Sequence, residues 1–215
     1  MTKLSVNINK IATIRNARGG NTPNLVEAAI KIQEFGGQGI TIHPRPDERH
    51  IRYQDVYDLK PVVTTEFNIE GKPIDSFIEL VLNSKPEQVT LVPDAEDAIT
   101  SNAGWDTIKH FDYLTDVIKT FKDAGIRTSI FLDPNPALIE SAAKTGADRI
   151  ELYTEEFATQ YSLGNLEAIN PYKETAKLAI ENGLAVNAGH DLSLDNIEYF
   201  IREIPTIAEV SIGHA

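Results

Sequence analysis

The stretch VIKTFKDAGIRTSIFLD, residues 117–133, contains the pattern from which the fold can be predicted. Apolar residues at helical spacing run into its first half and form one face: Leu114, Val117, Ile118 and Phe121. Gly125 follows, where the end of a helix favours a left-handed residue. The next run, 126–132, is short and mostly apolar, as expected of a strand buried on both faces. The stretch therefore predicts a helix, a glycine turn and a buried strand.

The same order recurs along the chain. It is found in AAIKIQEFGGQGITIHP (28–44), LIESAAKTGADRIELYT (138–154) and TAKLAIENGLAVNAG (175–189). Eight strands are predicted in this way, at about 3–9, 39–44, 64–70, 88–93, 127–133, 149–154, 185–189 and 208–213. Near-regular alternation of helices and strands indicates a parallel sheet. Eight such units in 215 residues favour a (β/α)8 barrel with extra helices in its loops, formed by a single domain over residues 1–215.

An open doubly wound sheet is the alternative fold. Neither a GxGxxG motif nor a P-loop follows the first predicted strand, which makes this alternative weaker. The sequence stops at VSIGHA (210–215), on the eighth predicted strand. A bare last strand would leave apolar surface exposed, so we expect the final helix of the barrel to be missing from this sequence rather than from the protein.

Composition narrows the class of protein. A formal net charge of −12 argues against general binding to nucleic acid, which requires a basic face. No apolar run approaches the roughly 20 residues of a membrane helix, and the N-terminus MTKLSVNINK lacks the features of a secretion signal. The chain has no cysteine, which excludes disulfides, thiolate zinc sites and a cysteine nucleophile. These features fit a cytoplasmic protein.

Charge is unevenly distributed along the chain. Residues 1–26 contain no Asp or Glu, yet they carry four cations: Lys3, Lys10, Arg15 and Arg18. A cationic region in an acidic chain suggests that a small anion is held in a pocket. A solvated basic surface is the alternative interpretation.

Polar residues gather at the ends of the predicted strands. They are Asn7, Asn9, Lys10, His43, Arg45, Glu66 or Glu70, Asp133, Glu151, His190 and His214, with Thr100 in the long loop after the fourth strand. In a barrel the carboxyl ends of the strands meet at one rim, where active sites are built. Glu151 would point inward, because its neighbours Ile150 and Leu152 point outward. Two carboxylates and three histidines could form a proton-transfer set.

Two groups of cations suggest two phosphate sites. The stretch GITIHPRPDERH (39–50) carries His43, Arg45, Arg49 and His50, and an Arg side chain can donate two parallel hydrogen bonds to a phosphate. The turns AGHD (188–191) and IGHA (212–215) follow strands seven and eight, whose loops frequently bind phosphate in barrels. Glycine there allows backbone N–H groups to approach an anion. The ligand would be a bisphosphate or two phosphorylated substrates.

Six segments of the sequence together resemble the pyridoxine 5′-phosphate synthase family. They are VNINKIATIRNARGGNTPN (6–24), GITIHPRPDERHI (39–51), FNIEG (67–71), RIELYT (149–154), VNAGHDL (186–192) and IGHA (212–215). The resemblance extends from residue 4 to the C-terminus. It implies a (β/α)8 barrel that assembles as an octamer of paired dimers. It also implies the condensation of 1-deoxy-D-xylulose 5-phosphate with 3-amino-2-oxopropyl phosphate, by acid–base catalysis without a cofactor.

The resemblance also implies roles for particular residues. His43 and Glu70 would accept protons, His190 would donate one, and Glu151 would stabilise charge or orient an intermediate. Those expected to hold the deoxyxylulose phosphate are Arg45, His50 and Thr100. Those expected to hold the aminoketone phosphate are Asn7, Arg18, Gly213 and His214.

The sequence departs from the family pattern at two places. Asn9-Lys10 stands where many members have Asp-His, and Asp191 stands where many have Gly. We still expect all three residues to contact substrate, with altered affinity.

Two other functions remain open at this point. One is a metal-dependent sugar isomerase with His43, Glu70, Glu151 and His190 as ligands. The other is a barrel that binds phosphorylated ligands without catalysis.

Overall fold

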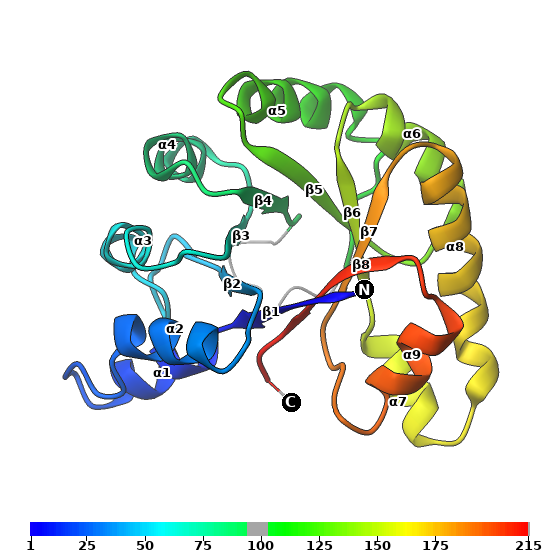
Figure 1. Ribbon diagram of the computed structural model, residues 1–215. Helices are drawn as coiled ribbons and strands as arrows, with labels where there is room; N and C mark the ends of the chain where they lie inside the picture. The colour runs from blue at the N-terminus through cyan, green and yellow to red at the C-terminus, as the bar shows by residue number, and fades with distance from the viewer. Residues whose placement is uncertain (94–102, 215) are drawn as a thin grey trace.

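The computed structural model describes residues 1–93 and 103–214, and it confirms the closed parallel barrel (Figure 1). The strands lie around the barrel in sequence order, and β8 closes it by pairing with β1. Each of the eight predicted strands is present: β1 Lys3–Asn7, β2 Gly39–Ile42, β3 Glu66–Gly71, β4 Gln88–Leu91, β5 Arg127–Leu132, β6 Arg149–Tyr153, β7 Ala185–Gly189 and β8 Ile207–Ile212.

Helices surround the strands on the outside, as Figure 1 shows. Within the described residues they are α1 Asn9–Ala17, α2 Leu25–Glu34, α3 Tyr53–Leu59, α4 Asp75–Ser84, α5 Phe111–Asp123, α6 Ile139–Lys144, α7 Glu155–Ser162, α8 Asn170–Glu181 and α9 Ile197–Glu203. The extra helices are α1, which precedes α2, and α7, which precedes α8. Short 3-10 helices cover Pro136–Leu138 and Leu166–Ile169. None of the helices in 1–93 and 103–214 has the length and apolar character to cross a bilayer.

Glycines after the helices adopt the left-handed conformation that the sequence pattern predicts. The φ angles are +97° at Gly36, +77° at Gly125, +86° at Gly146 and +81° at Gly183. A residue with a β-carbon is disfavoured in this region, which explains the use of glycine at these four turns from helix to strand. The local signal in the sequence and the observed backbone therefore agree.

The two faces of the strands differ in character. Outward side chains such as Ile40 and Ile42 are fully buried in the apolar core between barrel and helices. The middle of the barrel is instead filled by a chain of buried polar side chains. Thr41 is 2.7 Å from Ser5 and accepts a hydrogen bond from Asn68 at 3.3 Å, and Thr90 donates to Asn68 at 3.1 Å. Branched apolar residues usually fill this space, so the interior of this barrel is unusually polar.

The amino-terminal end of the barrel is closed by partly buried ion pairs. Glu66 pairs with Arg127, and Arg149 lies 3.8 Å from Glu66 and 3.6 Å from Glu209. Burial, with the nearby charge of Glu66, raises the pKa of Glu209 to about 8, which keeps this carboxyl mostly protonated at neutral pH. The sequence left Glu66 and Glu70 as alternatives for the functional rim, and Glu66 lies at the opposite end.

Candidate active site

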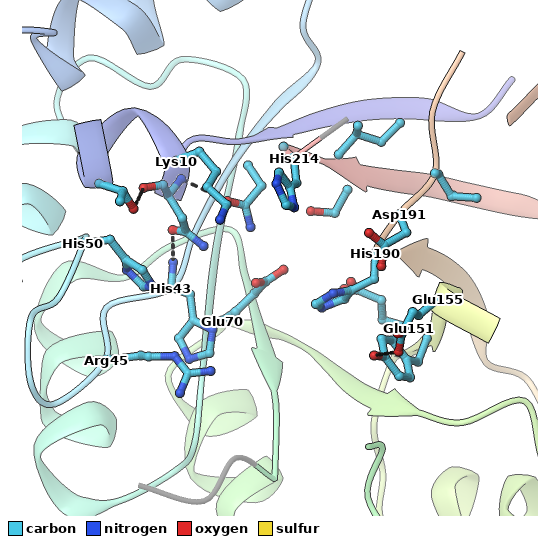
Figure 2. A pocket seen from close by; sticks show the side chains of 18 of the residues that line it. Lys10, His43, Arg45, His50, Glu70, Glu151, Glu155, His190, Asp191 and His214 are labelled. Carbon is cyan, nitrogen blue, oxygen red and sulfur yellow. Dashed lines mark hydrogen bonds between the residues drawn. The ribbon is translucent and has the colours of Figure 1, made fainter. Parts of the chain in front are cut away.

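A cavity of about 620 Å³ opens at the carboxyl ends of the strands. It brings together most of the residues that the sequence singled out: Asn7, Asn9, Lys10, His43, Arg45, His50, Glu70, Glu151, His190, Asp191, Gly213 and His214. Figure 2 shows Lys10, His43 and His50 on one side of this cavity and His190, Asp191 and Glu155 on the other. Side chains that follow β1 and β2 therefore face side chains that follow β6 and β7.

Two expected site residues are not placed in this cavity. Arg18 follows α1, is exposed and does not line the cavity of its own chain. Thr100 lies outside the described residues. Of the other cations in residues 1–26, Lys10 lines the cavity, whereas Arg15 pairs with Asp55 and Lys3 lies 3.8 Å from Glu66. Of these four cations, only Lys10 is therefore placed at this cavity.

The loop after β2 supplies the cationic wall of the cavity. Arg45, Arg49 and His50 all line it. Burial, together with the charges of Arg45 and Arg49, lowers the pKa of His50 to about 4, so the imidazole is neutral at pH 7. The backbone N–H of Ile51 donates to Nδ1 of His50 at 2.9 Å. The ring proton is therefore on Nε2, from which His50 can donate to an anion.

His43 lies at the end of β2 and is 7% exposed. Burial, followed by the charges of Arg45 and His50, lowers the pKa of His43 well below 6.5. A neutral imidazole has a lone pair, so His43 can accept a proton at physiological pH. Its backbone N–H donates to Oδ1 of Asn9 at 2.9 Å, an interaction drawn in Figure 2.

The ends of β1 and β8 lie close together at the rim. The Oδ1 atom of Asn7 accepts the backbone N–H of Asn9 at 3.0 Å and so shapes the start of α1. A β-carbon at Gly213 would overlap the carbonyl oxygen and the β-carbon of Asn7. Glycine at this position therefore allows β8 to end beside Asn7. Both asparagines have structural roles in addition to lining the cavity.

Two carboxyl groups enter the cavity from the barrel strands. Glu70 on β3 points into it toward the side that carries His190 (Figure 2). Glu151 on β6 is 2% exposed, and the Thr90 hydroxyl donates to it at 3.5 Å. Burial raises the pKa of Glu151 to about 7, so this group can both give and take a proton near neutral pH. A β-carbon at Gly189 would overlap Oε1 of Glu151, which explains the glycine beside it.

His190 is held in an uncommon backbone conformation beside two aromatic rings. Its φ angle is +78°. The ring centroids of Phe131 and Tyr153 lie 5.3 and 5.0 Å from that of His190, and Tyr153 packs edge-on. The Thr154 hydroxyl bonds the carbonyl oxygens of Gly189 and His190, and its backbone N–H donates to the former at 2.9 Å.

Sequence reasoning missed these neighbours of His190. Tyr153 follows Glu151 by two residues and so lies on the same face of β6, which is a signal that strand alternation could have supplied. The role of Thr154 depends on a partner 36 residues away, and no local pattern indicates it.

The alternative of a metal site finds no support in the geometry. In the two described segments, no group of three or more His, Asp and Glu side chains is arranged so that it could hold one metal ion. His43, Glu70, Glu151 and His190 therefore do not form such a group.

Fold and site together define a class of protein: a (β/α)8 barrel with histidines, carboxyls and a cationic loop gathered at the carboxyl ends of its strands. A family model described as pyridoxal phosphate biosynthesis protein PdxJ matches residues 4–215. The chain belongs to this family.

Close relatives share one name. The pyridoxine 5′-phosphate synthase of Christiangramia forsetii is 68% identical over 215 residues, which are 100% of this chain and 91% of the relative. The protein of the same name from Flavobacterium johnsoniae is 69% identical with the same coverage. A solved thiamine phosphate pyrophosphorylase from Pyrococcus furiosus superposes with a TM-score of 0.61 at 13% identity, covering 100% of this chain and 86% of that one. That likeness concerns the fold alone.

Proposed function

We propose that this chain acts as a pyridoxine 5′-phosphate synthase. It condenses 1-deoxy-D-xylulose 5-phosphate with 3-amino-2-oxopropyl phosphate to give pyridoxine 5′-phosphate, inorganic phosphate and water. Family membership and the names of the relatives support this activity. The observation that carries it is the convergence of His43, Glu70, Glu151 and His190 on one cavity with a cationic wall.

The cationic wall fits the phosphate of the deoxyxylulose substrate. Arg45 and the Nε2–H of His50 are its proposed donors, and Thr100 would be a third. Asn7, Gly213 and His214 are proposed for the aminoketone phosphate, beside Asn9, Lys10 and Asp191 at the same rim. Arg18 is exposed outside the cavity of its own chain, so its proposed role depends on assembly of the homo-oligomer.

The reaction consists of proton transfers around carbonyl carbons. The amine of one substrate adds to the ketone of the other, water leaves, and an imine forms. Enolisation, loss of phosphate, addition of water and an aldol-type closure of the ring follow. Two further losses of water make the ring aromatic, so two molecules of water are released overall. His43, as a neutral imidazole, and Glu70 would take protons from carbon or from the adding amine. His190 would return a proton to a leaving oxygen.

Glu151 has a different task in this proposal. Its carboxyl is buried below the substrates, and its pKa of about 7 allows it to become charged when a cation develops nearby. A carboxylate in a dry site stabilises an iminium more strongly than it would in water. These groups supply acid and base at each step, so the proposal requires no cofactor.

The test is turnover of the purified protein with both substrates, with the product identified by mass spectrometry. His43→Ala should abolish product formation while the circular dichroism spectrum stays that of a folded protein. His110→Ala is the matched control, because His110 is the histidine that does not line the cavity. A wild-type protein that binds both substrates without forming product would favour the non-catalytic binding barrel. Full activity of His43→Ala would remove that residue from the mechanism.

A cytoplasmic location and an octamer of paired dimers belong to the same proposal. The resemblance to the family supports the octamer, and the cysteine-free composition fits the reducing cytoplasm. Light scattering coupled to gel filtration should give about eight times the chain mass of 23.8 kDa. A monomeric mass would count against this assembly and against a role for Arg18.

A further inference from the structure

A buried ion pair connects the two helices that flank the cationic loop. Arg15 on α1 donates from Nη1 to Oδ1 of Asp55 at 2.5 Å and from Nη2 to Oδ2 at 2.9 Å, and Asp55 belongs to α3. Arg15 is 3% exposed and Asp55 is 7% exposed. Removing two charges from water costs roughly as much as their attraction returns, so stability alone is a weak reason for such a pair.

The pair and a neighbour hold the backbone of the loop directly. Nη2 of Arg15 donates to the carbonyl oxygen of His50 at 3.1 Å, and Oδ2 of Asp55 accepts the backbone N–H of Arg52 at 2.7 Å. The side-chain amide of Asn16 donates to the same His50 oxygen at 2.8 Å. Asn16 also donates to the carbonyl oxygen of Arg49 at 3.2 Å, so side chains of α1 and α3 fix the loop on both sides of the residue whose imidazole faces the cavity.

The loop requires this support because of its backbone conformation. Arg45 and Arg49 lie on one short segment with His50, and all three line the same cavity. Glu48, between them, has a φ of +50°, which is uncommon for a residue other than glycine. A left-handed residue adds strain, so without anchors the loop would favour a different arrangement. Within the loop Arg49 is held by Asp47 at 2.6 Å, and the anchors from α1 and α3 hold the backbone that follows.

We propose that Arg15, Asp55 and Asn16 are positioning residues for the phosphate subsite, since they hold the carbonyl of His50 and the N–H of Arg52 so that the cations converge before substrate binds. The inference deepens the proposed function and rests on it. Preorganisation of this kind lowers the cost of ordering on binding. It should therefore act on the affinity for one substrate, and much less on the chemical steps.

Arg15→Lys is the first test. Lysine keeps the charge but lacks the planar guanidinium whose N–H groups reach both Asp55 and the loop carbonyl. We expect KM for deoxyxylulose phosphate to rise about tenfold, which is typical for loss of a hydrogen bond to a charged group. KM for the aminoketone phosphate and kcat should change by less than about threefold, the size of effect expected without a lost contact. Equal changes in both KM values, or a fall in kcat alone, would overturn the inference.

Asn16→Ala is the second variant and leaves the buried charges in place. It should raise the same KM by about threefold, because it removes the bond to the loop carbonyl and the Oδ1 that accepts from Arg15 Nε at 3.1 Å and Arg52 Nη2 at 2.9 Å. An unchanged KM in a folded Asn16→Ala protein would contradict the proposal even if Arg15→Lys fails to fold. Leu184→Ala is the control for lost stability, since Leu184 is buried just before β7, at the other end of the barrel. Its KM values should stay at those of the wild type.

Calorimetry with deoxyxylulose phosphate alone separates this inference from the proposed activity. Weaker binding to Arg15→Lys than to the wild type supports the positioning role, whether or not product is formed. Binding of equal strength would overturn it while leaving the synthase activity to be judged by turnover.

Discussion

Replacement of Glu151 by glutamine should make the free energy of unfolding fall less as the pH rises. Glu151 is 2% exposed, and burial raises its pKa from 4.5 to about 7, with the Thr90 hydroxyl at 3.5 Å as an opposing influence. Below pH 4.5 the folded and the unfolded chain both hold this proton. Between pH 4.5 and 7 the unfolded chain releases it while the folded chain retains it, so rising pH favours unfolding. Above pH 7 Glu151 is ionised in both states, and its contribution to the free energy of unfolding no longer changes with pH.

The magnitude follows from the two pKa values. Each pH unit between them corresponds to ~1.4 kcal/mol, so the free energy of unfolding loses about 3 kcal/mol in total through this group. Glutamine has no proton to lose. The free energy of unfolding of Glu151→Gln minus that of the wild type should therefore increase by about 2.5 kcal/mol from pH 5 to pH 8. The charge of Glu151 also raises the pKa of Glu209, so its removal acts in the same direction there.

Urea unfolding followed by tryptophan fluorescence measures this difference. Trp105 is the single tryptophan and is 5% exposed, so its emission reports loss of the core. Glu79→Gln is the control for loss of a carboxyl group, because Glu79 is an exposed side chain of α4, and the difference measured for Glu151→Gln is read against it. If the free energy of unfolding of Glu151→Gln minus that of the wild type does not change with pH, this carboxyl is already ionised in the folded protein at pH 5. The reasoning from burial would then be refuted.

Three further predictions concern the walls of the cavity. Thr154→Val loses the hydroxyl that bonds the carbonyl of His190 and should lower kcat about tenfold, whereas Thr154→Ser should restore it; equal kcat values in steady-state kinetics would contradict this. Gly189→Ala places a β-carbon against Glu151, so kcat should fall at least about tenfold while the circular dichroism spectrum stays native. An unaltered kcat would show that the carboxyl can move aside. His50 has a pKa of about 4, so its ring should stay neutral from pH 6 to 8. The ratio of the phosphate affinities of the wild type and His50→Gln, measured by calorimetry, should therefore stay constant over this range. A step in this ratio near pH 6.5 would count against a neutral ring.

The fold could be predicted because its signals are local. A helix, a left-handed glycine such as Gly125 and a short strand repeat along the chain, and each step is determined by residues a few positions apart. The rim could be predicted for a related reason, since parallel strands bring their carboxyl ends to one side. Glu70 and His190 are far apart in sequence, yet both follow from that single rule.

The missed features depend on contacts between distant segments. Arg15 was interpreted as part of an anion site because residues 1–26 lack acids, but its partner Asp55 lies 40 positions away. The polar chain inside the barrel was missed because Thr41 and Asn68 are ordinary strand residues whose shared interior is set by register. The choice between Glu66 and Glu70 likewise required the direction of β3.

The departures from the family pattern can be understood from what these positions do. Asn9 stands where many members have Asp, and its Oδ1 accepts the backbone N–H of His43 at 2.9 Å. That role requires an oxygen acceptor and no charge, so an amide can replace a carboxylate without moving His43. Asp191 stands where many have Gly, at a φ of +56°. Asp is among the few residues other than glycine that tolerate this region. Asp191 therefore fits the turn that carries His190, and Asn9 and Asp191 are both compatible with the geometry on which the proposed chemistry depends.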